Sequence, residues 1–139
     1  MKVFISYASK KDEPLADKIV ASLEEAGLDA WYKKREILPG DNWAEKIGTG
    51  LRDSNAMVVL VTPDALESEA VQSSISYALS ERAFRHRLIP VIVGDADEVV
   101  DLDNKMPWIL KHLRTFKLSK EGENQERFKE IAQALKDAA

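Results

Sequence analysis

The chain has 139 residues, of which 45% are hydrophobic and 32% charged, a composition typical of one globular domain rather than of a disordered regulator. The formal net charge of -4 argues against a nucleic-acid-binding surface, and the lack of cysteine excludes disulfides, thiolate metal sites and cysteine nucleophiles. No apolar run is long enough to span a membrane, and the first strand starts too early for a signal peptide to precede it, so we expect a single cytoplasmic domain over residues 1–139.

The N-terminal part predicts a β-α-β unit, because two short apolar runs flank an amphipathic segment. The first strand is expected over residues 2–7 and the second over residues 28–32. The helix between them is expected to begin at about Asp12, with Pro14 in its first turn. It should end at Gly27, a residue suited to a left-handed C-cap.

A charged segment over residues 33–41 follows, and its Pro39-Gly40 turn signal favours a loop that is longer than most strand-helix connections. Long loops of this kind are often functional. Asn42, with Glu45 three residues later, resembles a capping box that opens a short helix. The inner face of this helix is expected to carry Trp43, Ile47 and Leu51.

The middle of the chain predicts two central strands. Residues 55–61 form a nearly unbroken apolar run, as expected for a parallel strand that is buried on both faces. Thr62-Pro63 then starts a helix that is expected from Asp64 to about Arg85. Residues 88–93 are expected to form the fourth strand.

After residue 94 the periodicity weakens, and residues 95–103 are expected to form a loop with about one helical turn. A short edge strand is expected over residues 114–118. The final segment is an amphipathic helix with Phe128, Ile131 and Leu135 on one face. Five strands and about five helices predict an α/β fold, a flavodoxin-like doubly wound parallel sheet of order 2-1-3-4-5 with helices on both faces.

Four segments, taken together and in order, carry a family resemblance. They are Val3-Phe-Ile-Ser-Tyr7 with Lys11-Asp12, Ile37-Leu-Pro-Gly40 with Trp43, the run 54–63, and the run 87–91. They resemble the first box, the BB loop, the third strand and the fourth strand of the TIR (Toll/interleukin-1 receptor) domain family, bacterial type. The resemblance covers essentially the whole chain. It implies either cleavage of the nicotinamide-ribose bond of NAD or association through TIR-TIR contacts without chemistry, and the shared fold does not decide between them.

The resemblance also implies where a catalytic residue would lie. Enzymatic members carry a glutamate on the helix after the third strand, where a carboxylate stabilises positive charge at the ribose, and a tryptophan four residues earlier that packs on the nucleotide. Alignment on Ser68-Glu69 and on residues 77–79 places Ser74 at the glutamate position and Ala70 at the tryptophan position. Both members of the pair are therefore absent, and Ser74 is expected to be catalytically non-functional.

Several other residues of the right chemical type are expected to be structural or solvated. Glu67 and Glu81 return to the helix face of Ser74 but lie about 10 Å away along the axis, and Glu69 points elsewhere, so none of them replaces the carboxylate. A further group is expected to lie at the surface or in packing contacts, without metal-site or phosphate-loop spacing: His86, His112, Trp31, Gly48 and Gly50.

The ligand crevice of a doubly wound sheet lies beyond the carboxyl ends of its strands. The candidate nucleotide-binding residues at that edge are Tyr7, Ala8, Lys33, Lys34, Arg35, Trp43 and Ala70. The three cations suit a pyrophosphate, although a solvated basic loop is slightly favoured over that interpretation. Trp43 suits stacking on a nucleobase, but its predicted inward position favours core packing.

We therefore expect a signalling or immune module that assembles with itself or with other TIR-domain proteins and has NAD-like nucleotides as candidate ligands. The expected interface comprises Ile37, Leu38, Pro39, Gly40 and Asp41. The alternative is an NAD+ glycohydrolase or ADP-ribosyl cyclase that produces ADP-ribose-type signals in bacterial anti-phage immunity. No cofactor is expected, since NAD would be substrate or ligand, and no metal, membrane or nucleic-acid partner is expected.

Overall fold

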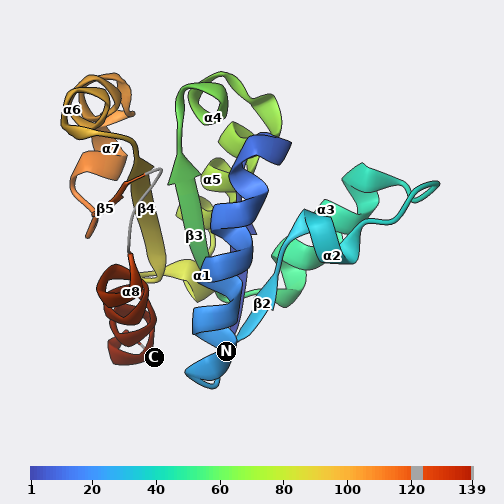
Figure 1. Ribbon diagram of the computed structural model, residues 1–139. Coiled ribbons are helices and arrows are strands. Elements are labelled where there is room, and N and C mark those ends of the chain that lie inside the picture. The colour runs from blue at the N-terminus through green and yellow to red at the C-terminus, as the bar shows by residue number, and fades with distance from the viewer. Residues whose placement is uncertain (120–123, 139) are drawn as a thin grey trace.

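A parallel sheet of five strands runs through the middle of the molecule in the order β2-β1-β3-β4-β5 (Figure 1), which confirms the predicted topology. The computed structural model describes residues 1–119 and 124–138. The strands are β1 (Lys2–Ser6), β2 (Asp29–Trp31), β3 (Ala56–Val61), β4 (Leu88–Val93) and β5 (Phe116–Leu118). Every residue of β3 and β4 is buried, as expected for central strands covered on both faces.

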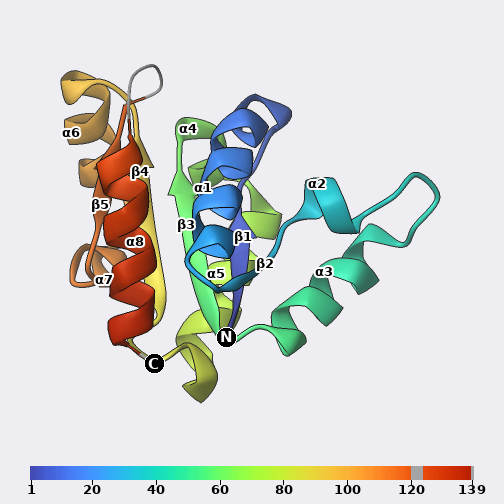
Figure 2. The ribbon, with the colours of Figure 1, turned by 60° about the horizontal axis from the view of Figure 1, so that its bottom comes forward.

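Helices cover both faces of the sheet, and each face has its own apolar core. The helices α1 (Glu13–Glu25) and α8 (Gln125–Asp137) pack side by side on one face, in front of the sheet in Figure 2. The other face is covered by α3 (Trp43–Asp53), α5 (Glu69–Ser80), α6 (Ala96–Lys105) and α7 (Trp108–Lys111). Within β1, Val3 and Ile5 join the first core and Phe4 the second, because successive side chains of a strand point to opposite faces.

The single helix predicted from residue 64 to 85 is wrong, because the segment contains two helices and a final 3-10 turn. These are α4 (Pro63–Glu67), α5 and η2 (Arg82–Phe84). The break lies at Ser68, whose backbone is extended and whose Oγ accepts a hydrogen bond from the N–H of Val71 at 3.2 Å. A serine side chain that caps α5 in this way satisfies an otherwise free donor of the new helix, and so it favours a second helix start.

Two predicted loops contain helices. Residues 33–36 form the short helix α2 (Lys33–Glu36), and the segment expected as a loop over residues 95–103 is mostly α6. The start of α6 is a full capping box, in which Asp95 accepts from the N–H of Glu98 at 2.9 Å and Glu98 accepts from the N–H of Asp95 at 3.2 Å. The reciprocal pair starts this helix despite its weak hydrophobic pattern.

The segment from α2 through α3 stands out from the body as an arm, at the right of Figures 1 and 2. We call residues 33–53 the arm. Its loop turns at Gly40, which has a positive φ of 91°, and the Asp41 carboxylate accepts a hydrogen bond from the N–H of Leu38 at 2.9 Å. A left-handed backbone of this kind favours glycine, so the turn explains the Pro39-Gly40 pair seen in the sequence.

The base of the arm is held by a close approach of α3 to the sheet. Trp31 is buried and stacks on Phe4 with a ring-centroid distance of 4.7 Å. Gly50 lies against the Trp31 ring, so that a Cβ added there would be 2.4 Å from the ring atom Cε2. The absence of a side chain at Gly50 therefore allows α3 to reach the sheet, which confirms the packing role expected for this glycine.

Gly50→Ala is expected to destabilise the fold by about 1–3 kcal/mol, because the Trp31–Phe4 stack must shift to admit a methyl group. Gly48→Ala is the matched control in the same helix. The nearest atom to its added Cβ is the flexible guanidinium nitrogen of Arg52 at 3.4 Å, so helix propensity should stabilise the protein by up to about 1 kcal/mol. Chemical denaturation of both variants measures this difference, and destabilisation of equal size at the two sites would contradict it.

The turn η1 (Lys10–Asp12) joins β1 to α1, and it contains a carboxylate that is unfavourably solvated. Asp12 Oδ2 is buried and has no hydrogen-bond partner among the described residues. Burial raises the pKa of Asp12 above its ordinary value, although the backbone hydrogen bond from Ser9 opposes this effect. A raised carboxyl pKa in the folded state means that ionisation at neutral pH opposes folding.

Asp12→Asn is therefore expected to raise the Tm at pH 7, because it removes a poorly solvated charge. The stabilisation should be at most on the order of 1 kcal/mol, since Asp12 is partly exposed and water screens its charge. The gain should shrink as the pH falls toward 3.8, the ordinary pKa of this group, because the wild-type carboxyl is then protonated as well. Thermal melts of the two proteins in the same buffers test the sign. A gain that grows on acidification would contradict it.

Candidate functional site

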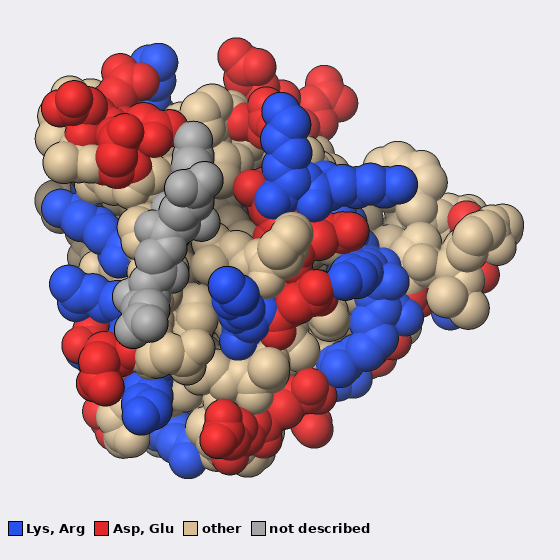
Figure 3. Space-filling view, viewed as in Figure 1, with Lys and Arg blue, Asp and Glu red and all other residues tan. Residues whose placement is uncertain are grey.

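A groove of about 510 Å³ lies beyond the carboxyl end of β1, between the body and the arm. This is the edge of the sheet where the fold predicts a ligand crevice. The side chains that line the groove come from η1, α1, the arm and α5: Ala8, Lys10, Glu13, Lys33, Lys34, Ile37, Trp43, Ile47 and Ala70. Lys and Arg side chains gather at its outer side, over α2 (Figure 3).

A small recess adjoins the groove, with which it shares Lys33, Ile47 and Ala70. Its volume is about 30 Å³, enough for about one or two water molecules. The recess is also lined by Ser6, Tyr7 and Ser74. The predicted pair Ala70 and Ser74 therefore lies in one place, with Ala70 at the groove and Ser74 at the recess.

Ser74 is only 3% exposed, and its hydroxyl donates a hydrogen bond to the carbonyl oxygen of Ala70 at 2.9 Å. This bond runs within α5 and engages the one proton of the hydroxyl. The position aligned with the family glutamate thus presents neither a charge nor a free donor to the recess.

No neighbouring glutamate on α4 or α5 supplies the missing charge to the groove or the recess. Glu67, Glu69 and Glu81 are all exposed and lie outside the lining of both, as expected from the sequence. The reason given from a continuous helix is wrong for two of them, because the break at Ser68 separates Glu67 from α5 and α5 ends before Glu81.

Lys33 is the predicted cation most closely tied to the site. Its ammonium donates to the carbonyl oxygens of Tyr7 at 3.0 Å and Ala8 at 3.1 Å and lies 4.5 Å from the centroid of the Tyr7 ring. Burial lowers the pKa of Lys33, while the nearby carboxylates of Glu13 and Asp12 oppose that shift. Lys33 therefore lies as a fixed, half-buried cation where the groove meets the recess.

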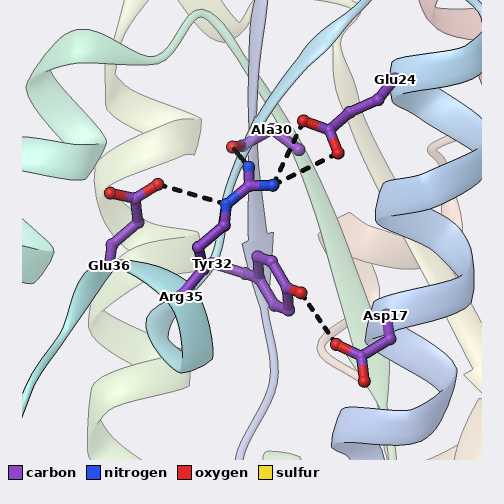
Figure 4. Close-up of polar contacts among 6 residues, drawn as sticks. All are labelled: Asp17, Glu24, Ala30, Tyr32, Arg35 and Glu36. Atoms are coloured by element: carbon purple, nitrogen blue, oxygen red, sulfur yellow. Dashed lines mark hydrogen bonds and ion pairs between the residues drawn. The ribbon is translucent and has the colours of Figure 1, made fainter.

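Arg35 does not line the groove, and its polar contacts are with α1, with β2 and within its own helix (Figure 4). Its guanidinium donates to the carbonyl oxygen of Ala30 at 2.6 Å and to the Glu24 carboxylate at 3.2 Å, and it pairs with Glu36 at 3.5 Å. These contacts tie α2 to β2 and α1. Arg35 thus holds the base of the arm in this structure, rather than facing a ligand.

Lys34 lines the groove but is also engaged. Its ammonium forms an ion pair with Asp17 at 2.6 Å, and this contact raises the pKa of Lys34. The same Asp17 accepts a hydrogen bond from the hydroxyl of Tyr32 at 2.8 Å (Figure 4). An exposed ion pair of this kind contributes little to stability, so Lys34 can exchange its partner at small cost.

Glu13 is a groove residue that the sequence analysis missed. Its carboxylate oxygen Oε2 accepts a hydrogen bond from the Tyr7 hydroxyl at 2.7 Å. Burial and the Glu13 carboxylate raise the pKa of Tyr7, so its hydroxyl keeps its proton and remains a donor. In the sequence Glu13 is one more acidic residue at a helix start, and only the fold of η1 brings it beside Tyr7.

Trp43 points outward rather than into the core, so the packing role favoured from its helix position is wrong. Its side chain is 59% exposed and forms part of the groove wall. As the first residue of α3 it precedes the part of the helix that touches the sheet, where Gly50 and Leu51 are buried. Sequence periodicity alone did not show that the first turn of α3 leaves the body.

The five predicted interface residues divide between the groove and the tip of the arm. Ile37 is partly buried and lines the groove, whereas Leu38, Pro39 and Gly40 are exposed at the tip. Asp41, which follows them, is partly buried. Leu38 is 61% exposed, and the tip is largely uncharged in Figure 3. The arm thus has an inner surface that faces the groove and an apolar tip that faces solvent.

The described residues contain no group of three or more histidine, aspartate or glutamate side chains arranged to hold a metal ion. His86 and His112 are both exposed, which confirms their predicted surface positions. No helix in residues 1–119 and 124–138 is long and apolar enough to cross a membrane.

Solved structures of similar fold include TIR domains of animal proteins. The metazoan TIR-STING receptor from C. gigas superposes with a TM-score of 0.71 and 23% identity, over 94% of this chain and 38% of that one. The TIR domain of the Toll-related receptor TRR-2 from Hydra magnipapillata superposes with a TM-score of 0.63 and 24% identity, over 83% of this chain and 82% of that one. At this identity the likeness shows the fold alone.

Curated relatives include two bacterial proteins. The chain is 25% identical over 87 residues to the 2′ cyclic ADP-D-ribose synthase AbTIR of Acinetobacter baumannii, covering 63% of this chain and 32% of the relative. It is 26% identical over 90 residues to the NAD(+) hydrolase PdTIR of Paracoccus denitrificans, covering 64% and 30%. The matched region is thus about a third of each relative.

The family model for the TIR domain matches residues 3–135, which covers the groove and all five strands apart from Lys2, the first residue of β1. This match confirms the resemblance drawn from the four sequence segments. The chain belongs to the TIR domain family.

Proposed function

We propose that this chain is a TIR signalling module that assembles with itself or with other TIR-domain proteins, and that its groove binds an NAD-like nucleotide without cleaving it. The observation that carries the proposal is the state of Ser74, whose hydroxyl is buried and bonded within its own helix at the position aligned with the family glutamate. Cleavage of a nicotinamide-ribose bond develops positive charge on the ribose, and a neutral, engaged hydroxyl does not stabilise that charge.

Nucleotide binding is supported by the size and the charges of the groove. A volume of about 510 Å³ lies within the range of small-molecule sites. Lys10, Lys33 and Lys34 line it, and their ammonium groups suit a pyrophosphate. Trp43 adds an exposed aromatic face on which a nucleobase can stack. The names of the two bacterial relatives describe enzymes that act on NAD or make a cyclic ADP-ribose, which favours a ligand of this class.

Assembly is supported by the tip of the arm. Leu38 projects from a loop that Gly40 turns and Asp41 braces, so the apolar side chain is presented on a defined backbone. Leu38 and Trp43 are both large apolar side chains exposed on the arm, and exposed apolar surface on a projecting element is suited to a contact with a partner. Another TIR domain is the partner class that family membership favours.

The second candidate function is NAD cleavage to ADP-ribose-type products. It is favoured by the activities named for the bacterial relatives and by the presence of a carboxylate, Glu13, in the groove. Under this alternative, Glu13 or a residue of a partner chain would supply the charge that Ser74 lacks.

Nicotinamide release distinguishes the two candidates. Wild-type protein incubated with NAD at high concentration, with and without a crowding agent, is expected to release no more nicotinamide than NAD incubated without protein. Ser74→Glu restores a carboxylate beside the groove and is expected to raise release by about tenfold or more, provided that its thermal melt shows a folded protein. Release by the wild type well above the protein-free control would replace the proposal with the cleavage alternative.

Leu38→Asp tests the arm as an interface. A charge at this exposed site should leave the fold intact and weaken self-association or TIR partner binding by about tenfold or more, since it would be desolvated at the contact. Val100→Asp is the matched control, because Val100 is 62% exposed and belongs to α6, a helix that lies on the other side of the molecule from the arm in Figure 1. Analytical ultracentrifugation and pull-down with a second TIR domain measure the effect. Equal results for the two variants would exclude the tip of the arm as the interface.

A further inference from the structure

The groove contains one carboxylate among its ammonium groups. Glu13 is the first residue of α1 and lines the groove together with Lys10, Lys33 and Lys34. The proposed binding of an anionic nucleotide does not by itself need a negative charge there, and a carboxylate beside a pyrophosphate would be repulsive. The position of Glu13 therefore indicates that its carboxylate contacts a part of the ligand other than the pyrophosphate.

Contacts to the buried Tyr7 fix the orientation of the Glu13 carboxylate. Tyr7 is 3% exposed, and its hydroxyl donates to Oε2 of Glu13 at 2.7 Å. Oε1 of Glu13 accepts no hydrogen bond from any of the described residues. One oxygen is thus held by the protein, and the other is available to a donor in the groove.

Lys33 limits where an anion and a donor can lie. Its ammonium is held by the carbonyl oxygens of Tyr7 and Ala8, above the same Tyr7 ring whose hydroxyl holds Glu13. A fixed cation and a fixed acceptor therefore share one wall of the groove. This arrangement matches a nucleotide, in which a diphosphate lies next to a ribose with two hydroxyl donors.

A carboxylate distinguishes a free ribose from a phosphorylated one. It accepts hydrogen bonds from the 2′ and 3′ hydroxyls, and dinucleotide-binding folds use an acidic residue in this way, whereas an arginine accommodates a 2′-phosphate. A 2′-phosphate offers no equivalent donor and brings two negative charges toward the carboxylate, a like-charge contact that costs affinity.

We propose that Glu13 is a specificity-determining residue that accepts hydrogen bonds from the free 2′ and 3′ hydroxyls of the adenosine ribose. The groove would then take NAD-like ligands and reject ligands that are phosphorylated at this 2′ position, such as NADP. The inference rests on the proposed nucleotide binding but not on whether the nucleotide is cleaved.

Calorimetric titration of the full chain with NAD and with NADP tests the inference. The wild type is expected to bind NAD about tenfold or more tightly than NADP. Glu13→Gln keeps an oxygen acceptor but removes the charge, and it is expected to reduce this ratio to about twofold or less, mainly by improving NADP binding. Tyr7→Phe removes the hydroxyl that orients the carboxylate, and its ratio should fall between the two.

Glu25→Gln is the matched control, because it removes the same charge from an exposed site in the last turn of α1, outside the groove. It should keep the wild-type ratio. Thermal melts of all variants separate a change of specificity from a loss of fold, since a purely structural role of Glu13 would lower the Tm without changing the ratio.

The outcomes separate the inference from the proposed function. If the wild type binds neither NAD nor NADP, the proposed nucleotide binding is wrong and the inference falls with it. If both bind but with equal affinity, or if Glu13→Gln leaves the ratio unchanged, the role of Glu13 is wrong and the groove remains a nucleotide site.

Discussion

The groove depends on Tyr7, where β1 ends between the two layers of helices. The hydroxyl of Tyr7 holds Glu13, its carbonyl oxygen holds Lys33, and the Lys33 ammonium lies over its ring. β1 itself pairs with β2 on one side and β3 on the other, so Tyr7 follows a strand that cannot move without disturbing the sheet. The charged groups of the groove are therefore positioned by the most constrained part of the fold.

The position expected to carry the family's catalytic group is held by contacts other than those of Tyr7. Ser74 lies on α5, whose start is set by the Ser68 cap and whose inner face is set by Val71 and Ala78. Replacement of a glutamate by a serine at that position needs no change in these contacts, because the serine hydroxyl bonds to its own helix. The fold can thus keep a shaped, charged groove with or without a carboxylate at position 74, which is why family membership alone does not settle activity.

The sequence predicted the parts of the structure that depend on continuous apolar runs. The fully buried strands β3 and β4 and the strand order followed from such runs and from the alternation with helices. The errors arose where a single polar contact decides the backbone. The Ser68 cap divides one predicted helix into two, and the Asp95–Glu98 pair starts a helix where the apolar pattern is weak.

The candidate site was predicted less completely, for a different reason. Its place at the end of β1, and the proximity of Lys33, Ala70 and Ser74, followed from the topology and the family alignment. The outward position of Trp43 and the pairing of Glu13 with Tyr7 depend on how the arm and the turn η1 leave the sheet. Contacts between segments that are joined by irregular turns have no periodic signature in the sequence.

The arm connects the two parts of the proposed function. Ile37 and Trp43 line the groove, and Leu38 lies beside Ile37 at the exposed tip. A ligand in the groove would pack against the inner surface of the arm, while a partner TIR domain would contact its outer end. Because both would act on the same short segment, whose base is held by Arg35 and by the contact of Gly50 with Trp31, nucleotide occupancy and assembly would be linked. Any such linkage is reciprocal: a nucleotide that favours assembly must bind more tightly to the assembled form.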